Sequence, residues 1–208
     1  RLRQAISIAL DRNRMGQAMF NGFFVYGSPV GQAIRTWAMP YEELLRKPGY
    51  RSRREEREQD LVEAKQMWEA AGGADIGRVG AIYTAVPSWV KNYWPLAVRE
   101  LSQVLGLELD SKIDPTGYTE IVQCLLEGRP DCTFGMAYDN GWIDLDDCVH
   151  PYFYTGAPKN SFKLSDPTLD EMLDAQRAEF DLDKRRQLGY QIQHYLLDKV
   201  LARLDWVS

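Results

Sequence analysis

Residues 131–147 decide the fold, and they read Asp131-Cys132-Thr133-Phe134-Gly135-Met136-Ala137-Tyr138-Asp139-Asn140-Gly141-Trp142-Ile143-Asp144-Leu145-Asp146-Asp147. The first eight residues follow Arg129-Pro130 and are partly β-branched and aromatic, which predicts a buried strand over 131–138. Asn140-Gly141 then predicts a turn at the end of this strand. Four carboxylates and one indole lie within the nine residues 139–147.

Ligands of open α/β sheets bind outside the carboxyl ends of the strands. The acidic, aromatic loop after residue 138 is therefore the leading candidate for a binding site. The alternative interpretation is a solvated acidic loop in which Trp142 packs over the core and Asp139 caps its own turn.

Strands and helices are predicted to alternate over 78–138. Residues 78–84 predict a strand, 97–105 a helix, 107–113 a strand and 118–125 a helix that ends at Gly128. Asp114-Pro115 reads as a helix N-cap followed by proline at the first helical position. These spacings predict right-handed parallel βαβ crossovers, and hence an α/β fold with a mainly parallel sheet flanked by helices on both faces. Three loops meet at its carboxyl edge: 85–89, 114–117 and the loop from 139 onward.

The flanking sequence is mostly helical in pattern. The chain predicts one amphipathic helix over 1–21, closed by Asn21-Gly22, and an irregular segment over 23–40. Residues 50–58 read as a solvated link or the start of a helix. Further helices are expected at 41–47, 60–71, 166–176 and 188–196, and a strand at 204–207. Gly72-Gly73 predicts the end of the helix over 60–71, and Asp166-Pro167 predicts the cap of the helix over 166–176.

The composition narrows the class of protein. The 208 residues are 45% hydrophobic and 26% charged, which is typical of a globular chain. A net charge of −5 disfavours a nucleic-acid partner. No run approaches the roughly 20 apolar residues that span a bilayer. The three cysteines are an odd count, so Cys124 and Cys132 are expected to be buried small hydrophobic residues rather than a disulfide.

Residues 2–12, Leu2-Arg3-Gln4-Ala5-Ile6-Ser7-Ile8-Ala9-Leu10-Asp11-Arg12, resemble the opening of the C-terminal lobe in the extracytoplasmic solute-binding proteins of ABC importers. The branch concerned is the large one that binds peptides, nickel or oligosaccharides (family 5). Four further segments are similar to it in order and spacing: 60–72, 101–107, 118–131 and 166–186.

The resemblance implies that residues 1–208 are a single C-terminal lobe of the type II periplasmic-binding-protein fold, with the N-terminal lobe absent. The chain begins without Met and inside a helical pattern, which agrees with a fragment. Such a protein captures a solute between two lobes and delivers it to a membrane permease. It would be a monomer without a cofactor, located in the periplasm or, lipid-anchored, at the outer face of the cytoplasmic membrane.

The resemblance also places the ligand. In dipeptide-binding members an Asp of this loop takes the ligand's α-amino group, and the most similar position here is Asp139. The family's Asp-Pro-Asp is replaced by Asp144-Leu145-Asp146. The predicted ligand-binding residues are Asp139, Asn140, Trp142, Asp144 and Trp89; the alternative for the tryptophans is packing in the core or between lobes.

Three other functions compete with peptide binding. Oligosaccharide binding by the same architecture would use the tryptophans for stacking. A carboxylate-based glycoside hydrolase would use the same acids, although the chain carries no recognisable catalytic motif. Asp144, Asp146, Asp147 and His150 could ligate calcium, but they lack the EF-hand pattern, so no metal is expected.

Overall fold

The computed structural model of the chain describes residues 1–84, 86, 89–132, 134–136, 143–161, 163–199 and 206–207. It divides into two compact units. Unit 1 comprises Arg1–Phe24 and Leu45–Asp139, and unit 2 comprises Val25–Leu44 and Asn140–Ser208. Each unit is therefore built from two separate stretches of chain, and the chain passes from one unit to the other three times.

A three-stranded parallel sheet forms the centre of unit 1. Its strands are β2 (Arg78–Thr84), β3 (Glu108–Asp114) and β4 (Phe134–Met136), in the order β3-β2-β4. β2 pairs with β3 along its whole length and with β4 over Ala81–Tyr83. The predicted parallel βαβ arrangement is confirmed, but the strand expected over 131–138 is shorter, because Pro130–Cys132 form a short 3-10 helix, η2.

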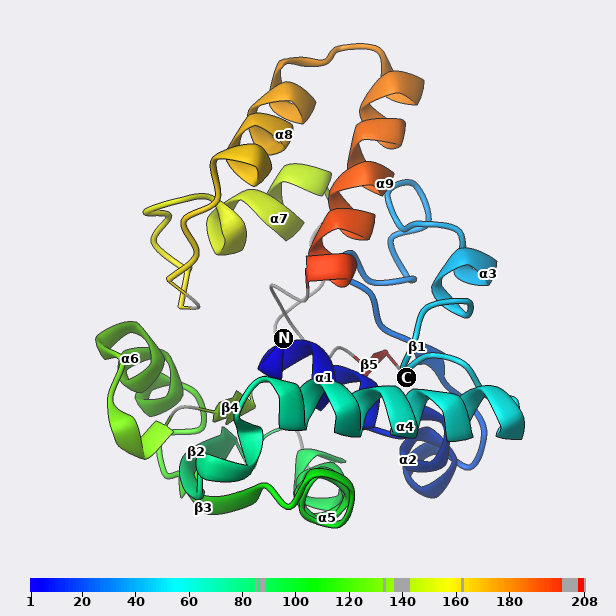
Figure 1. Cartoon of the computed structure of the whole chain (residues 1–208). Helices are drawn as coiled ribbons and strands as arrows, with labels where there is room; N and C mark the ends of the chain where they lie inside the picture. The colour runs from blue at the N-terminus through cyan, green and yellow to red at the C-terminus, as the bar shows by residue number, and fades with distance from the viewer. Residues whose placement is uncertain are drawn as a thin grey trace. The chain divides into compact units, whose positions relative to one another are not determined.

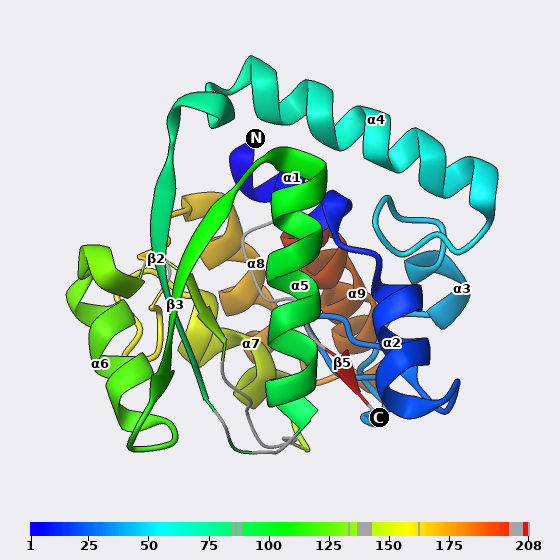
Figure 2. The same cartoon turned by 90° about the horizontal axis from the view of Figure 1, so that it is seen from below.

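Helices α5 (Trp89–Leu105) and α6 (Thr119–Glu127) lie on opposite sides of β2 and β3 (Figure 2). Tyr83 stacks on Trp94 of α5, with ring centroids 5.4 Å apart. Ile82, the residue before Tyr83 in β2, packs with Ile121 and Cys124 of α6. Neighbouring strand residues point to opposite faces, so each face of β2 meets its own helix.

Gly80 allows η2 to lie directly against β2. A Cβ atom on Gly80 would lie 2.6 Å from the backbone of Asp131 and 2.7 Å from the carbonyl oxygen of Pro130. Any larger side chain would push η2, and the strand β4 that follows it, away from the sheet.

The single helix predicted for residues 1–21 is wrong: the structure has two helices, α1 (Leu2–Ala9) and α2 (Arg12–Phe20). α1 lies along α4 (Arg54–Ala70) in unit 1 (Figure 1). Leu10 between them is extended, and Asp11 caps α2 by accepting the N–H of Arg14 at 2.8 Å. Arg57 of α4 donates to the carbonyl oxygens of Ile8 and Ala9, which satisfies the open end of α1.

A cluster of buried polar side chains stabilises the break in helical structure between α1 and α2. Arg12 is 1% exposed and donates to the carbonyl oxygens of Ser7 (2.7 Å) and Gly49 (2.8 Å). Asp60 is fully buried and accepts the N–H of Gly49 at 2.8 Å and a hydrogen bond from Arg51. Gly49 has φ +83°, and a Cβ there would lie 2.8 Å from Arg12, so both conformation and space require glycine.

The remaining boundaries of unit 1 follow the sequence closely. α4 begins at Arg54 rather than at 60, so residues 54–58 belong to the helix and are not a link. The predicted stops are confirmed, because Asn21, Gly72 and Gly128 all adopt the left-handed conformation. Gly73–Asp75 form a further 3-10 turn, η1.

Unit 2 is helical, with α3 (Tyr41–Leu44), α7 (Leu145–Phe153), α8 (Pro167–Ala178) and α9 (Leu182–Lys199). A short antiparallel pair joins β1 (Val25–Tyr26) to β5 (Trp206–Val207). The predicted cap is confirmed: Asp166 accepts the N–H of Leu169 at 3.2 Å ahead of α8. Gln193 of α9 donates to Trp37 O (2.8 Å) and accepts from Met39 N (3.0 Å), which fastens the irregular segment to α9.

The core of unit 2 is formed by α7, α8 and α9 together with Val30 and Trp37 of the irregular segment. Among the described residues, none of the helices combines the length and the apolar character needed to cross a bilayer.

One buried carboxyl of unit 1 opposes the stability of the fold. Glu100 of α5 is 7% exposed, and its Oε2 has no hydrogen-bond partner. Burial raises the pKa of Glu100 above the ordinary value, against the opposing charges of Arg14 and Arg57. A raised folded pKa means that the contribution of this group is fully present below the unfolded value of about 4.3 and is lost as the pH rises.

Glu100→Gln is therefore expected to unfold at a higher temperature than the wild type at pH 7.5, by about 2–4 °C. The difference should disappear as the pH falls to about 4. Thermal unfolding followed by circular dichroism across this pH range measures it. Glu69→Gln, at an exposed position on α4, is the control and should not shift. A lower unfolding temperature for Glu100→Gln at pH 7.5 would contradict the prediction.

Candidate functional site

The parallel strands end at Thr84, Asp114 and Met136, so the loops that follow them start from one edge of the sheet of unit 1. This is the edge at which the sequence predicts a binding site. The hydroxyl of Thr84 is buried and lies within hydrogen-bond reach of the carbonyl oxygens of Val86 (2.9 Å) and Gly117. It also accepts the N–H of Val86 at 3.0 Å. One side chain thus holds together the loops that follow β2 and β3.

Asp114 organises the loop between β3 and α6. One carboxylate oxygen accepts the N–H (2.7 Å) and the hydroxyl (2.6 Å) of Thr116, and the other accepts the N–H of Ile121 at 3.0 Å. Burial alone raises the pKa of Asp114, but hydrogen bonds from Thr116 and Ile121 outweigh it and hold the pKa below its usual range. The N-cap predicted at Asp114, with Pro115 as the first helical residue, is wrong, because α6 begins at Thr119 and Tyr118 stands at its N-cap position. Asp114 nevertheless accepts the N–H of Ile121 in the first turn of α6.

The residues at the centre of the predicted site are not among those described. Asp139, Asn140 and Trp142 lie outside the described residues, and so does the side chain of Trp89, whose backbone begins α5. Their predicted roles in ligand binding therefore stay predictions.

Asp144 is described, and it lies in unit 2 at the start of α7. Its side chain caps the helix by accepting the N–H of Asp146 at 2.9 Å. Arg185 of α9 donates hydrogen bonds to both carboxylate oxygens of Asp144, from Nη2 to Oδ1 at 2.7 Å and from Nη1 to Oδ2 at 3.1 Å. Arg185 in turn lies over the ring of Trp37, 4.9 Å from its centroid, and Trp37 donates to the carbonyl oxygen of Ile143 at 3.2 Å.

This arrangement makes Asp144 part of the scaffold of unit 2. Burial alone raises its pKa, but the hydrogen bonds from Arg185 and from the N–H of Asp146, together with the charge of Arg185, lower it below the usual value. A ligand that approached Asp144 would compete with a bidentate guanidinium, the strongest common partner of a carboxylate.

The neighbouring Asp146 and His150 are also engaged by other side chains of unit 2. Asp146 accepts from Gln176 at 2.7 Å and pairs with Arg177 at 3.3 Å. His150 lies 3.0 Å from the same Arg177 and stacks on Tyr154. In the part of the chain that the structure describes, one group of metal-type ligands does come together, namely Cys124, Asp131 and Cys132.

Two members of that group are joined to each other. Cys124 of α6 and Cys132 of η2 form a disulfide, with Cα atoms 6.1 Å apart, so the expectation from the odd cysteine count that they form none is wrong, whereas their predicted burial is confirmed. Both residues are buried. The left-handed Gly128 ends α6 and turns the chain back, which brings the two cysteines together across eight positions.

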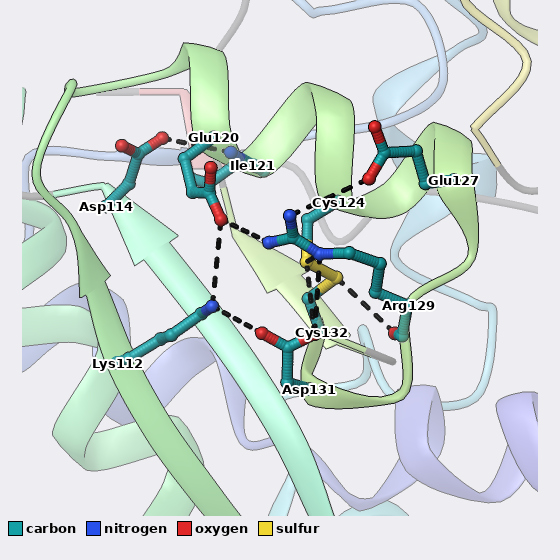
Figure 3. The surroundings of a disulfide bond; sticks show 9 residues. All are labelled: Lys112, Asp114, Glu120, Ile121, Cys124, Glu127, Arg129, Asp131 and Cys132. Carbon is teal, nitrogen blue, oxygen red and sulfur yellow. Dashed lines mark hydrogen bonds and ion pairs between the residues drawn. A yellow bond between two sulfur atoms is a disulfide. The ribbon is translucent and has the colours of Figure 1, made fainter.

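An ionic network surrounds the disulfide (Figure 3). Lys112 of β3 pairs with Asp131 at 2.6 Å and reaches Glu120 at 3.8 Å. Arg129 pairs with Glu120, with Asp131 at 3.4 Å and with Glu127 at 3.6 Å. The two cations are therefore matched by three carboxylates, two from α6 and one from η2. The segment that leads into β4 is thus held by ion pairs as well as by the disulfide.

Sequence reasoning missed the disulfide and the Asp144–Arg185 pair for different reasons. The cysteine spacing and the turn signals Gly128 and Pro130 were visible, and a turn between two cysteines was the available signal for the disulfide. Asp144 and Arg185 are 41 positions apart, and no local pattern links them.

Comparison with known proteins identifies the fold. No protein-family model matches the sequence, and no curated protein matches it. Solved structures do match, and three of them illustrate the likeness. NikA from Staphylococcus aureus, in complex with Ni(L-His)2, has 14% identity over 96% of this chain and a TM-score of 0.75. The murein tripeptide binding protein MppA of Escherichia coli has 13% identity over 96% and a TM-score of 0.72. The putative peptide binding protein AppA from Clostridium difficile has 20% identity over 99% and a TM-score of 0.71.

The chain spans only 37–40% of the length of these three structures. At such low identity the likeness shows the fold, which is the periplasmic solute-binding-protein fold. The resemblance found in the sequence is thereby confirmed at the level of the fold. That residues 1–208 form one lobe of a two-lobed protein stays a prediction.

Asp114→Asn tests the rigidity of the carboxyl edge. The amide keeps the shape but loses the charge and places N–H groups opposite backbone N–H donors, so it should cost about 1–3 kcal/mol in the free energy of unfolding at pH 7. Because the folded pKa is depressed, the stability that the carboxylate provides is present above about pH 4 and is lost as the pH falls through the folded pKa. The difference between variant and wild type should therefore shrink in acid.

Urea unfolding at pH 7 and in mild acid measures this effect. Asp110→Asn, at an exposed position on the same strand, is the matched control and should leave the free energy of unfolding unchanged. An Asp114→Asn variant as stable as the control at pH 7 would show that the carboxylate does not hold the loop.

Proposed function

We propose that this chain is a solute-binding lobe of an ABC importer's extracytoplasmic binding protein, and that it captures a peptide-like solute for delivery to a membrane permease. The observation that carries the proposal is the likeness in fold, with TM-scores of 0.71–0.75 over 96–99% of the chain. Two of the three neighbours are named as peptide binding proteins, which favours peptides over the nickel complex and over oligosaccharides.

In this proposal the solute binds at the carboxyl edge of the sheet of unit 1. Asp139 accepts the ammonium group of the solute, because a carboxylate makes its strongest hydrogen bonds with a charged donor. Asn140, Trp142 and Trp89 supply further polar and aromatic contacts. Asp144 positions the N-terminal end of α7, because its carboxylate caps this helix and is held by Arg185.

The described carboxyls favour a binder over a hydrolase. A general acid needs a raised pKa. Asp114, at the edge of the sheet of unit 1, and Asp144, a predicted ligand-binding residue in unit 2, both have lowered pKa values. Both are also occupied by donors from the chain itself. The neighbours in fold are binding proteins as well.

The disulfide supports an extracytoplasmic location. Disulfides persist in oxidising compartments such as the periplasm and are rare in the cytosol. Cys124–Cys132 is therefore the feature of this chain that agrees with the location of a solute-binding protein independently of the fold. The permease, and a second lobe that closes over the solute, are the partners that this proposal requires.

A ligand panel on the full-length protein tests the proposal. Short peptides, oligosaccharides and the nickel–histidine complex are each added while thermal unfolding is followed. We expect a peptide to stabilise the protein, by about 2.7 kcal/mol at 100 times its dissociation constant. Stabilisation by oligosaccharides alone, or turnover of any of these compounds, would contradict the proposal.

Asp139→Asn tests the role assigned to the acidic loop. Loss of a charge-assisted hydrogen bond costs about 1.5–3 kcal/mol, so peptide affinity should fall by about 10-fold to 100-fold. Isothermal titration of the full-length protein measures it. Asp147→Asn, an exposed acid on α7, is the control and should bind as the wild type does. Equal affinities for the two variants would remove Asp139 from the site.

A further inference from the structure

Among the described residues of the loops that follow β2 and β3, two large apolar side chains are exposed. Val86, two residues after β2, is 56% exposed, and Tyr118, four residues after β3, is 42% exposed. Their loops are joined through Thr84, whose hydroxyl contacts the backbone of Val86 and the carbonyl oxygen of Gly117 beside Tyr118. The two residues therefore belong to one small surface, here called the Val86–Tyr118 surface, on a backbone that is fixed by hydrogen bonds.

The polar groups next to this surface are already occupied. Asp114 accepts three hydrogen bonds from its own loop and from α6. The N-terminal turn of α6, which could otherwise bind an anion, gives the N–H of Glu120 to the hydroxyl of Thr116 (3.1 Å) and the N–H of Ile121 to Asp114 (3.0 Å). A solute at this point would meet neither an unengaged carboxylate nor an open helix terminus among these residues.

Two cations of unit 1, one on β3 and one in the turn after α6, are also paired. Lys112 pairs with Asp131 at 2.6 Å, and Arg129 pairs with Glu120. In Figure 3 both side chains point toward these carboxylates. An anionic solute would have to break these ion pairs before it gained either cation, so these residues favour an uncharged group.

We propose that the Val86–Tyr118 surface is a specificity-determining contact that selects solutes with an apolar side chain. This inference rests on the proposed function, because the edge of the sheet is where the solute is proposed to bind. Burial of apolar surface requires no polar partner, and it is the favourable interaction that this edge offers. Partial burial of one aliphatic and one aromatic side chain against the solute changes affinity by about tenfold.

Three tripeptides that differ only in the middle residue test the inference: Ala-Leu-Ala, Ala-Ser-Ala and Ala-Asp-Ala. Isothermal titration of the full-length wild type should give about tenfold tighter binding of the leucine peptide than of the serine peptide, and weaker binding still of the aspartate peptide. Val86→Asn and Tyr118→Ser should each weaken binding of the leucine peptide by about threefold, and the double variant should weaken it by about tenfold. Both should bind the serine peptide within twofold of the wild type.

Val62→Asn is the matched control, because Val62 on α4 has the same exposed fraction, 56%, as Val86. It should bind all three peptides as the wild type does. If the wild type binds the peptides but Val86→Asn and Tyr118→Ser keep its preference for leucine, the inference is overturned and the proposed function stands. If the wild type binds none of the three, the proposed function fails and the inference fails with it.

Discussion

The parallel pairing of β2 with a strand on each side is the constraint on which the rest of unit 1 depends. Ala81, Ile82 and Thr84 of this strand are fully buried, and its backbone pairs with β3 and β4 at once. Because all three strands run in the same direction, their following loops must begin at one edge. Gly80 adds a steric condition, since η2 packs against the position where a side chain would stand. The location of the candidate site follows from this pairing and not from any residue in the loops.

Much of this framework could be predicted from the sequence, because its signals are local. The strand over 78–84, the glycine stops at Gly72 and Gly128 and the cap at Asp166-Pro167 can each be recognised within a few residues. The break between α1 and α2 could not. Arg57 donates to the carbonyl oxygens of Ile8 and Ala9 from 49 and 48 positions away, and Gly49 accepts from Arg12 across 37 positions. The helical pattern continues across residue 10, so the break depends on these tertiary partners as well as on the local cap at Asp11.

The contrast between local signals and distant tertiary partners also applies to the predicted site. The edge itself was predicted correctly, since it is a consequence of topology. The availability of individual carboxylates was not, because it depends on distant partners: Asp144 is engaged by Arg185 from a helix 41 positions away. The disulfide shows a related error, in which an odd cysteine count was given more weight than a turn between Cys124 and Cys132. The predictions for Asp139, Asn140 and Trp142 concern residues that the structure does not describe.

A chain with an excess of acidic residues suggests a site for cations, and the described part of this chain argues for a different use of its acids. Asp60, Asp114 and Asp144 each accept hydrogen bonds from backbone N–H groups or pair with an arginine of the chain. Such carboxylates stabilise loops and helix ends, and a solute can use them only by displacing those donors. Under the proposed function, selectivity at the carboxyl edge therefore comes mainly from apolar contact with exposed side chains. The edge can then stay rigid and internally hydrogen-bonded while a small number of exposed side chains sets the solute class.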